Sequence, residues 1–117
     1  MNDNSTIEPE IEVPAADVVH RYFEVAAQAN TERYLALFAS DATAEDDGHT
    51  YHGVEQIREW RIEVVPVSYD VRDIRRIGPD LRAVVEISGN FPGSPVTLRF
   101  LFQISAEGLI TRLIIGS

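Results

Sequence analysis

Carboxylate, imidazole and phenol side chains gather in one short segment of this chain. The segment follows an apolar helical stretch, precedes a further helix that opens at Gly53, and contains Asp46, Asp47, His49, Tyr51 and His52. A carboxylate or a neutral imidazole can take up a proton near pH 7, and such groups are often carried by loops between rigid elements. The composition of this segment therefore indicates proton transfer, provided that its side chains face a pocket.

Two histidines and a carboxylate are also a possible metal-binding set. His49 and His52, however, are three residues apart in a loop, and short polar clusters of this kind often match by chance. We interpret both as exposed loop residues, with His52, beside Gly53, as the better candidate for an inward-facing base or proton shuttle. No metal site is assigned.

The composition is that of a single globular domain. The chain has 117 residues and a net charge of −9, and all 10 of its basic residues are arginine. Nucleic-acid binding is not expected, because no basic patch is present to neutralise phosphates. The sequence contains no cysteine, phosphate-binding glycine loop or dinucleotide fingerprint, so we expect no cofactor. No apolar run approaches the roughly 20 residues of a membrane helix and no secretory signal is visible, so a cytoplasmic protein is expected.

Helices are predicted in the first half of the chain. Residues 1–14 are polar and acidic and are expected to form a flexible tail, with one domain from 15 to 117. An amphipathic helix follows from Ala15, a second is capped by Asn30, and a third opens at Gly53 and cannot pass Pro66. The residues expected on the buried sides of the first two helices include Val19, Tyr22, Phe23, Leu35, Leu37 and Phe38.

The second half of the chain alternates apolar and polar residues, as strands do. Strands are predicted over 67–77, 81–91, 96–104 and 109–115, and the alternation slips near Asp73, which suggests a bulge. Three helices followed by a four-stranded antiparallel sheet make an α+β domain.

This order of elements resembles the nuclear-transport-factor-2-like superfamily, which includes ketosteroid isomerases and polyketide cyclases of the SnoaL type. The stretch FASDATAED, residues 38–46, is similar to the isomerase stretch that carries the catalytic base, and GVEQI, residues 53–57, is similar to the opening of the third helix. The resemblance covers about 100 residues, from 18 to 115. It implies a cone-shaped fold in which a strongly curved, four-stranded antiparallel sheet, with short additional strands in the loops, wraps the helices around an apolar cavity.

The resemblance also implies roles for individual residues. Asp46 matches the general base, and Tyr22 matches the tyrosine that donates a hydrogen bond to the carbonyl oxygen of the substrate. A carboxylate in an apolar cavity loses solvation and becomes a better base near neutrality, and a phenol stabilises the oxyanion that forms. The alternatives are a solvated loop acid and a core tyrosine. The implied ligand is a small apolar carbonyl compound, and its cavity is expected to involve Trp60, Phe91, Phe100 and Phe102.

One group of the isomerase pattern is missing. The isomerases place a second, protonated aspartate on the third sheet strand, and in this sequence that position falls on Phe100. Neither 96–104 nor 109–115 contains an acidic residue. Two classes of function stay open: an isomerase- or cyclase-like enzyme, and a non-catalytic ligand-binding or dimerisation module. A homodimer is expected through the outer sheet face, which carries Thr97, Arg99, Leu101 and Gln103.

Overall fold

Three helices and a six-stranded sheet make up the part of the chain that the computed structural model describes, which is the backbone of residues 4–117 and the side chains of residues 15–117. The helices are α1 (Asn4–Ala26), α2 (Thr31–Leu35) and α3 (Gly53–Ile62). The strands are β1 (Phe38–Asp46), β2 (His49–His52), β3 (Ser68–Ile77), β4 (Asp80–Ser88), β5 (Val96–Ile104) and β6 (Ile110–Gly116).

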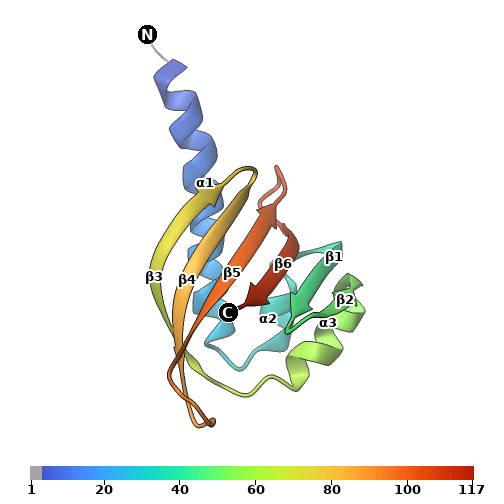
Figure 1. Ribbon diagram of the computed structural model, residues 1–117. Coiled ribbons are helices and arrows are strands. Elements are labelled where there is room, and N and C mark those ends of the chain that lie inside the picture. The colour runs from blue at the N-terminus through green and yellow to red at the C-terminus, as the bar shows by residue number, and fades with distance from the viewer. Residues whose placement is uncertain (1–3) are drawn as a thin grey trace.

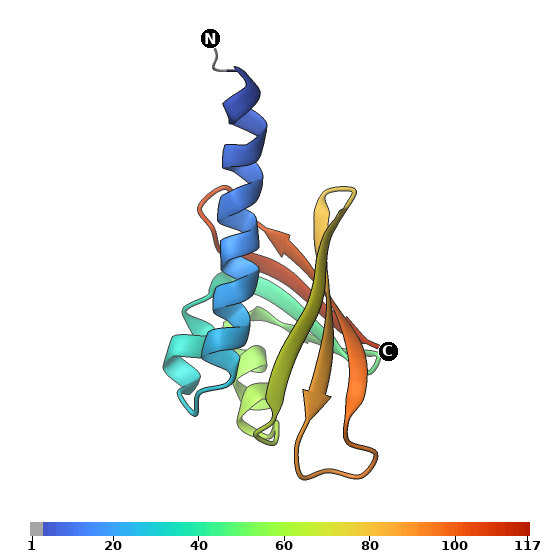
Figure 2. The ribbon, with the colours of Figure 1, turned by 90° about the vertical axis from the view of Figure 1, so that its left-hand side faces the viewer.

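The helices form one layer and the sheet forms the other. α1 runs along one face of the sheet, and its N-terminal part extends beyond it (Figure 1, Figure 2). α1 packs on β4 and β5, whereas α3 packs on β1 and β2. The two helices therefore cover different parts of the same sheet face.

The sheet corrects the predicted architecture. Its strand order is β2-β1-β6-β5-β4-β3, and β1 pairs parallel with β6 while the other neighbours are antiparallel. The predicted α+β class with three helices is confirmed, but the predicted four-stranded, strongly curved antiparallel sheet with short strands in the loops is not. The sheet is six-stranded and mixed and is not strongly curled. A lone β6 edge would leave a row of backbone N–H and C=O groups without partners, and β1 supplies them. A sheet of this width covers the helices without closing around them.

The acidic segment is a β-hairpin. Its turn is Asp47-Gly48, with φ values of 54° and 81°, and a two-residue hairpin turn with two positive φ values is the one that Asp-Gly favours. The hairpin places Asp46 directly across from His49. The predicted second helix is correspondingly shorter: α2 ends at Leu35, and Phe38 already belongs to β1.

Several local predictions are confirmed. The side chain of Asn30 caps α2 by accepting a hydrogen bond from the backbone N–H of Arg33 at 3.0 Å. α3 begins at Gly53, whose φ of 82° suits glycine. The β3–β4 register shifts between Val71 and Asp73, at the predicted bulge. These features rest on local backbone chemistry, which the sequence exposes directly.

The N-terminal part of α1 lies in the segment that was expected to form a tail. α1 begins at Asn4, so residues 4–14 continue the helix backbone, whereas the side chains of residues 1–14 lie outside the described ones. The division between tail and domain stays a prediction. None of the helices in the described part of the chain is long and apolar enough to cross a membrane.

An aromatic cluster fills the space between α1 and the sheet. The ring of Tyr22 lies edge-on to Phe23 and Phe102, with centroids 4.9 and 5.2 Å away, and Phe100 lies 5.0 Å from Phe23. All four side chains are buried. Edge-to-face aromatic contacts add to the stabilisation from apolar burial, so this cluster fixes α1 on the sheet. It also fixes the position of the Tyr22 hydroxyl.

Candidate functional site

Tyr22 is held by a second tyrosine. The hydroxyls of Tyr22 on α1 and Tyr34 on α2 lie 2.7 Å apart and share a hydrogen bond, in which either can donate. The rings of the two residues meet edge-on, with centroids 5.4 Å apart. If Tyr34 donates to Tyr22, the Tyr22 proton is available to another acceptor. The pair can therefore act as a relay that directs one O–H toward a ligand.

Burial keeps both phenols protonated. It raises the pKa of Tyr22 well above its ordinary value, with Tyr34 and Tyr69 adding to the rise and the charge of Arg61 opposing it. Burial likewise raises the pKa of Tyr34, against the hydrogen bond with Tyr22 and the charge of Arg61. A phenol in this state donates a hydrogen bond and does not ionise near pH 7.

Asp46 is held by the tryptophan of α3. The Trp60 indole Nε1–H donates to Asp46 Oδ2 at 3.1 Å, and the Asp46 side chain is half-buried at the end of β1. The ring of Tyr51, in β2, stacks on the ring of Trp60, with centroids 5.7 Å apart. The hairpin and α3 thus fix the carboxylate from two sides, and the hydrogen bond occupies only one of its two oxygens.

Tyr22 and Asp46 line the same pocket, which we call the Tyr22–Asp46 pocket. It has a volume of about 230 Å³, and Trp60, Arg61 and Tyr69 supply the rest of its polar lining. Its other walls are apolar and come from the segment after α3, from β4 and β5 and from the end of β6. The apolar residues include Val64, Val67, Ile87, Phe91, Leu98 and Phe100. A few polar groups in an apolar concavity are typical of a small-molecule site.

The structure places the other candidate residues in different surroundings. Phe91 and Phe100 line the Tyr22–Asp46 pocket. Phe100 contributes an apolar ring at the position where the resemblance to isomerases implies an acid. Phe102 is buried in the core and lines a different pocket. His52 is exposed at the N-cap of α3 and is not part of the lining. No group of three His, Asp or Glu side chains suited to a metal ion occurs among the described residues.

Arg61 is a pocket residue that the sequence did not reveal. It lies in the last turn of α3, and its guanidinium carbon sits 4.1 Å from the centroid of the Tyr34 ring. Arg61 Nη2 donates to the carbonyl oxygen of Ala26, the last residue of α1, at 2.6 Å. In the sequence Arg61 is one of several arginines in a charged helix, and its partners are up to 35 residues away. Only the packing of α3 against α1 and α2 brings the cation to the pocket.

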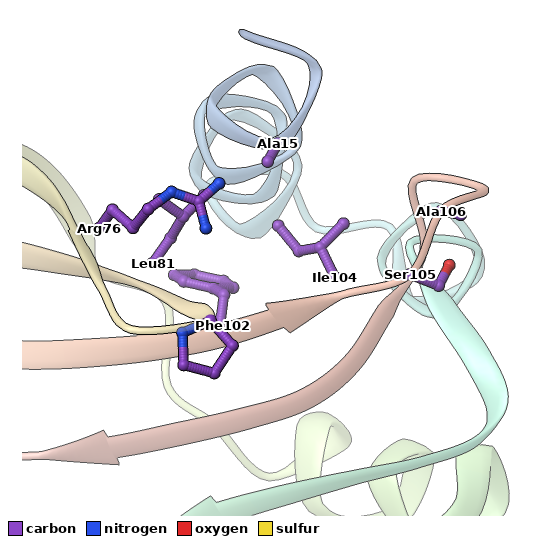
Figure 3. A pocket seen from close by; sticks show the side chains of 8 residues that line it. Ala15, Arg76, Leu81, Phe102, Ile104, Ser105 and Ala106 are labelled. Carbon is purple, nitrogen blue, oxygen red and sulfur yellow. The ribbon is translucent and has the colours of Figure 1, made fainter. Parts of the chain in front are cut away.

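A second pocket lies toward the other end of the sheet, beside α1. It has a volume of about 500 Å³, and Figure 3 shows Ala15 of α1 facing Leu81, Phe102 and Ile104 of the sheet, with Arg76 at one side. Pro79 of the β3–β4 turn and Ser105 and Ala106 of the β5–β6 turn complete the lining. None of the proposed proton-transfer residues reaches it, so we place the candidate site in the Tyr22–Asp46 pocket.

The fold is that of the nuclear-transport-factor-2-like class of α+β proteins. The model of the SnoaL-like domain family matches residues 19–113, and the chain belongs to this family. No protein of curated function matches the sequence.

Solved structures agree with this assignment. A proposed polyketide cyclase from Sinorhizobium meliloti is 33% identical, with a TM-score of 0.77, over 85% of this chain and 93% of that one. A protein with a ketosteroid isomerase-like fold from Catenulispora acidiphila, in complex with trimethylamine, is 22% identical (TM-score 0.73, 86% and 84% covered). The epoxide hydrolase/cyclase-like enzyme SalBIII of salinomycin pyran-ring formation is 16% identical (TM-score 0.78, 90% and 91% covered). The last two likenesses concern the fold alone.

Proposed function

We propose that the protein binds a small apolar carbonyl compound in the Tyr22–Asp46 pocket and moves a proton on it. Asp46 acts as the general base, and Tyr22 donates a hydrogen bond to the carbonyl oxygen. The observation that carries this proposal is that a carboxylate and a protonated phenol line one apolar pocket. The similarity to isomerase- and cyclase-like proteins supports it.

The proposed step needs only these two groups. Asp46 takes a proton from the carbon next to the carbonyl, the C–H electron pair becomes the C=C bond of an enolate, and the carbonyl electron pair moves to oxygen. Tyr22 stabilises the charge on that oxygen. Asp46 then returns the proton to the same carbon, which gives exchange, or to one further along, which gives isomerisation. No cofactor takes part in this step.

The pocket volume favours a small substrate. About 230 Å³ lies below the roughly 300–1,000 Å³ of pockets that hold drug-sized ligands, so a monocyclic enone suits it better than a four-ring steroid. His52 is exposed and is assigned no direct contact with the substrate; a proton-shuttle role for it would act through solvent at the hairpin.

The test is deuterium exchange into a cyclic enone, followed by proton NMR, with Asp46→Asn. Asparagine can still accept the Trp60 hydrogen bond, so the fold is preserved while the base is lost. Asp47→Asn is the matched control, because Asp47 is the adjacent, exposed acid and asparagine tolerates its positive φ. We expect Asp46→Asn to lower the exchange rate at least 100-fold and Asp47→Asn to leave it within twofold, a loss in line with the roughly 10²–10⁴-fold contribution of general bases. Equal rates for the two variants would exclude Asp46 as the base.

A non-catalytic module of the same fold is the second candidate. This candidate is favoured by Phe100, because the sheet then carries no acid where the isomerases place the second hydrogen-bond donor to the substrate oxygen. In that case the enone binds, which quenches the fluorescence of Trp60, the single tryptophan of the chain. The Asp46→Asn variant then exchanges deuterium at the same rate as the unmodified protein.

We also propose a homodimer through the outer sheet face, where Val84, Leu101 and Ile114 form a half-buried apolar patch. Such a patch, bordered by polar side chains, is typical of a contact surface.

A further inference from the structure

Arg61 brings a positive charge to a pocket that otherwise holds an acid and phenols. It is half-buried, lines the Tyr22–Asp46 pocket, and lies over Tyr34, whose hydroxyl holds that of Tyr22. Arginine remains charged at any physiological pH. Its positive charge therefore interacts with a ligand that binds beside the Tyr22 hydroxyl.

Among residues 15–117, no acid forms a salt bridge with Arg61. The other arginines near acidic groups, such as Arg58 with Glu32 and Arg72 with Glu86, form salt bridges on the surface. Within the part of the chain whose side chains are described, no carboxylate lies within salt-bridge distance of Arg61. Its partners are the Ala26 carbonyl oxygen, the ring face of Tyr34 and the hydroxyl of Tyr69. A half-buried cation without a carboxylate partner is a site at which an anion is stabilised on binding.

We infer that Arg61 is the second oxyanion-stabilising residue of the pocket, and that the site takes apolar ligands whose terminal oxygen carries or develops a negative charge. The inference rests on the proposed function and gives it a substrate class: acidic enols, such as 1,3-dicarbonyl compounds, and phenols. The acid that the isomerase pattern places on the sheet is Phe100 here, and Arg61 provides the missing stabilisation from α3 on the helical side.

The direction of charge movement supports this role. Before proton transfer the negative charge lies on Asp46; afterwards it lies on the substrate oxygen that Tyr22 holds. Proton abstraction therefore moves one negative charge away from Asp46 and toward the tyrosine pair over which Arg61 is packed. A fixed cation placed where charge develops stabilises the product of the step more than the starting state.

The experiment is an equilibrium titration with 4-nitrophenol and its neutral analogue 4-nitroanisole, read by Trp60 quenching and by the absorbance of bound nitrophenolate. With the unmodified protein we expect nitrophenolate to bind at least tenfold more tightly than nitroanisole. An opposite charge within about 4–6 Å moves a pKa by roughly 1–3 units, so we expect Arg61→Met to raise the pKa of bound nitrophenol by about one unit. Arg61→Met should weaken nitrophenolate binding about tenfold and leave nitroanisole binding within twofold.

Two further variants separate charge from packing. Arg61→Lys keeps the cation and is expected to retain most of the preference for nitrophenolate. Arg58→Met, in the same helix but outside the pocket lining, is expected to change neither ligand's affinity. Equal losses for both ligands in Arg61→Met, equal affinities for both in the unmodified protein, or no binding of nitrophenolate at all would each overturn the inference. If Arg61→Met does not fold, Arg61→Lys and the comparison in the unmodified protein still test the preference for the anion.

These titrations involve no proton abstraction. A failure of Asp46→Asn to change deuterium exchange would refute the proposed base and leave the anion preference measurable. A missing anion preference would refute the role of Arg61 and leave the exchange result standing.

Discussion

Removing the hydroxyl of Tyr22 is expected to destabilise the protein more than removing the hydroxyl of Tyr34. Tyr34 is 0% exposed and does not line the Tyr22–Asp46 pocket, whereas Tyr22 is 1% exposed and does line it. In Tyr22→Phe the Tyr34 hydroxyl is left buried without its partner. In Tyr34→Phe the Tyr22 hydroxyl can still meet water in the pocket.

The magnitudes follow from the cost of a buried polar group without a hydrogen bond, which is about 1–3 kcal/mol. We expect Tyr22→Phe to lower the free energy of unfolding by about 2 kcal/mol and Tyr34→Phe by about 1 kcal/mol. The double variant should cost no more than Tyr22→Phe alone, because removing both partners leaves no hydroxyl unsatisfied. The coupling energy of the pair is then at least about 1 kcal/mol.

Urea denaturation without ligand, followed by circular dichroism, measures these changes. A loss of about 2 kcal/mol moves the midpoint by roughly 1 M for a slope near 2 kcal/mol per M. Tyr51→Phe is the control, because its ring is half-buried against Trp60 and its hydroxyl makes no hydrogen bond within the described part of the chain. We expect a change below about 0.5 kcal/mol there. Additive losses in the double variant, or a larger loss in Tyr34→Phe, would refute the reasoning.

Three further predictions concern pH, assembly and capping. Because burial raises the pKa of Tyr22 and Tyr34, the folded state holds their protons more tightly than the unfolded state does; this stability is complete below about pH 10 and is lost as the pH rises through the folded-state values. The urea midpoint should therefore fall above about pH 10, and less so in the double phenylalanine variant. Leu101→Glu should convert the proposed dimer to a monomer in light scattering at micromolar concentration, and a monomeric unmodified protein would count against the dimer. Asn30→Ala should cost about 1 kcal/mol in the same urea assay, since it removes the cap of the five-residue helix α2, and no measurable change would mean that tertiary contacts alone hold this helix.

Local chemistry made much of the fold predictable. Period-two alternation located β3 to β6, and the start of α3 at Gly53 and the cap at Asn30 depend on residues within a few positions of one another. The Asp47-Gly48 pair also carried a hairpin signal, and the prediction missed it because the surrounding acids were interpreted as a loop. This hairpin supplies β1 and β2, in place of the short loop strands that the resemblance implied.

The sequence alone determined which residue types are available: a carboxylate at Asp46, a phenol at Tyr22, and no acid on the last two strands. Tertiary structure decided which of them meet. The parallel pairing of β1 with β6 turns Asp46 into a pocket residue, and the packing of α3 brings Trp60 and Arg61 to it. The hydrogen-bonding partners Tyr22 and Tyr34, and Arg61 and Ala26, are separated by 12 and 35 residues. Periodicity shows which face of each element is buried but not which other face it meets, so contacts over such separations leave no signal in the sequence.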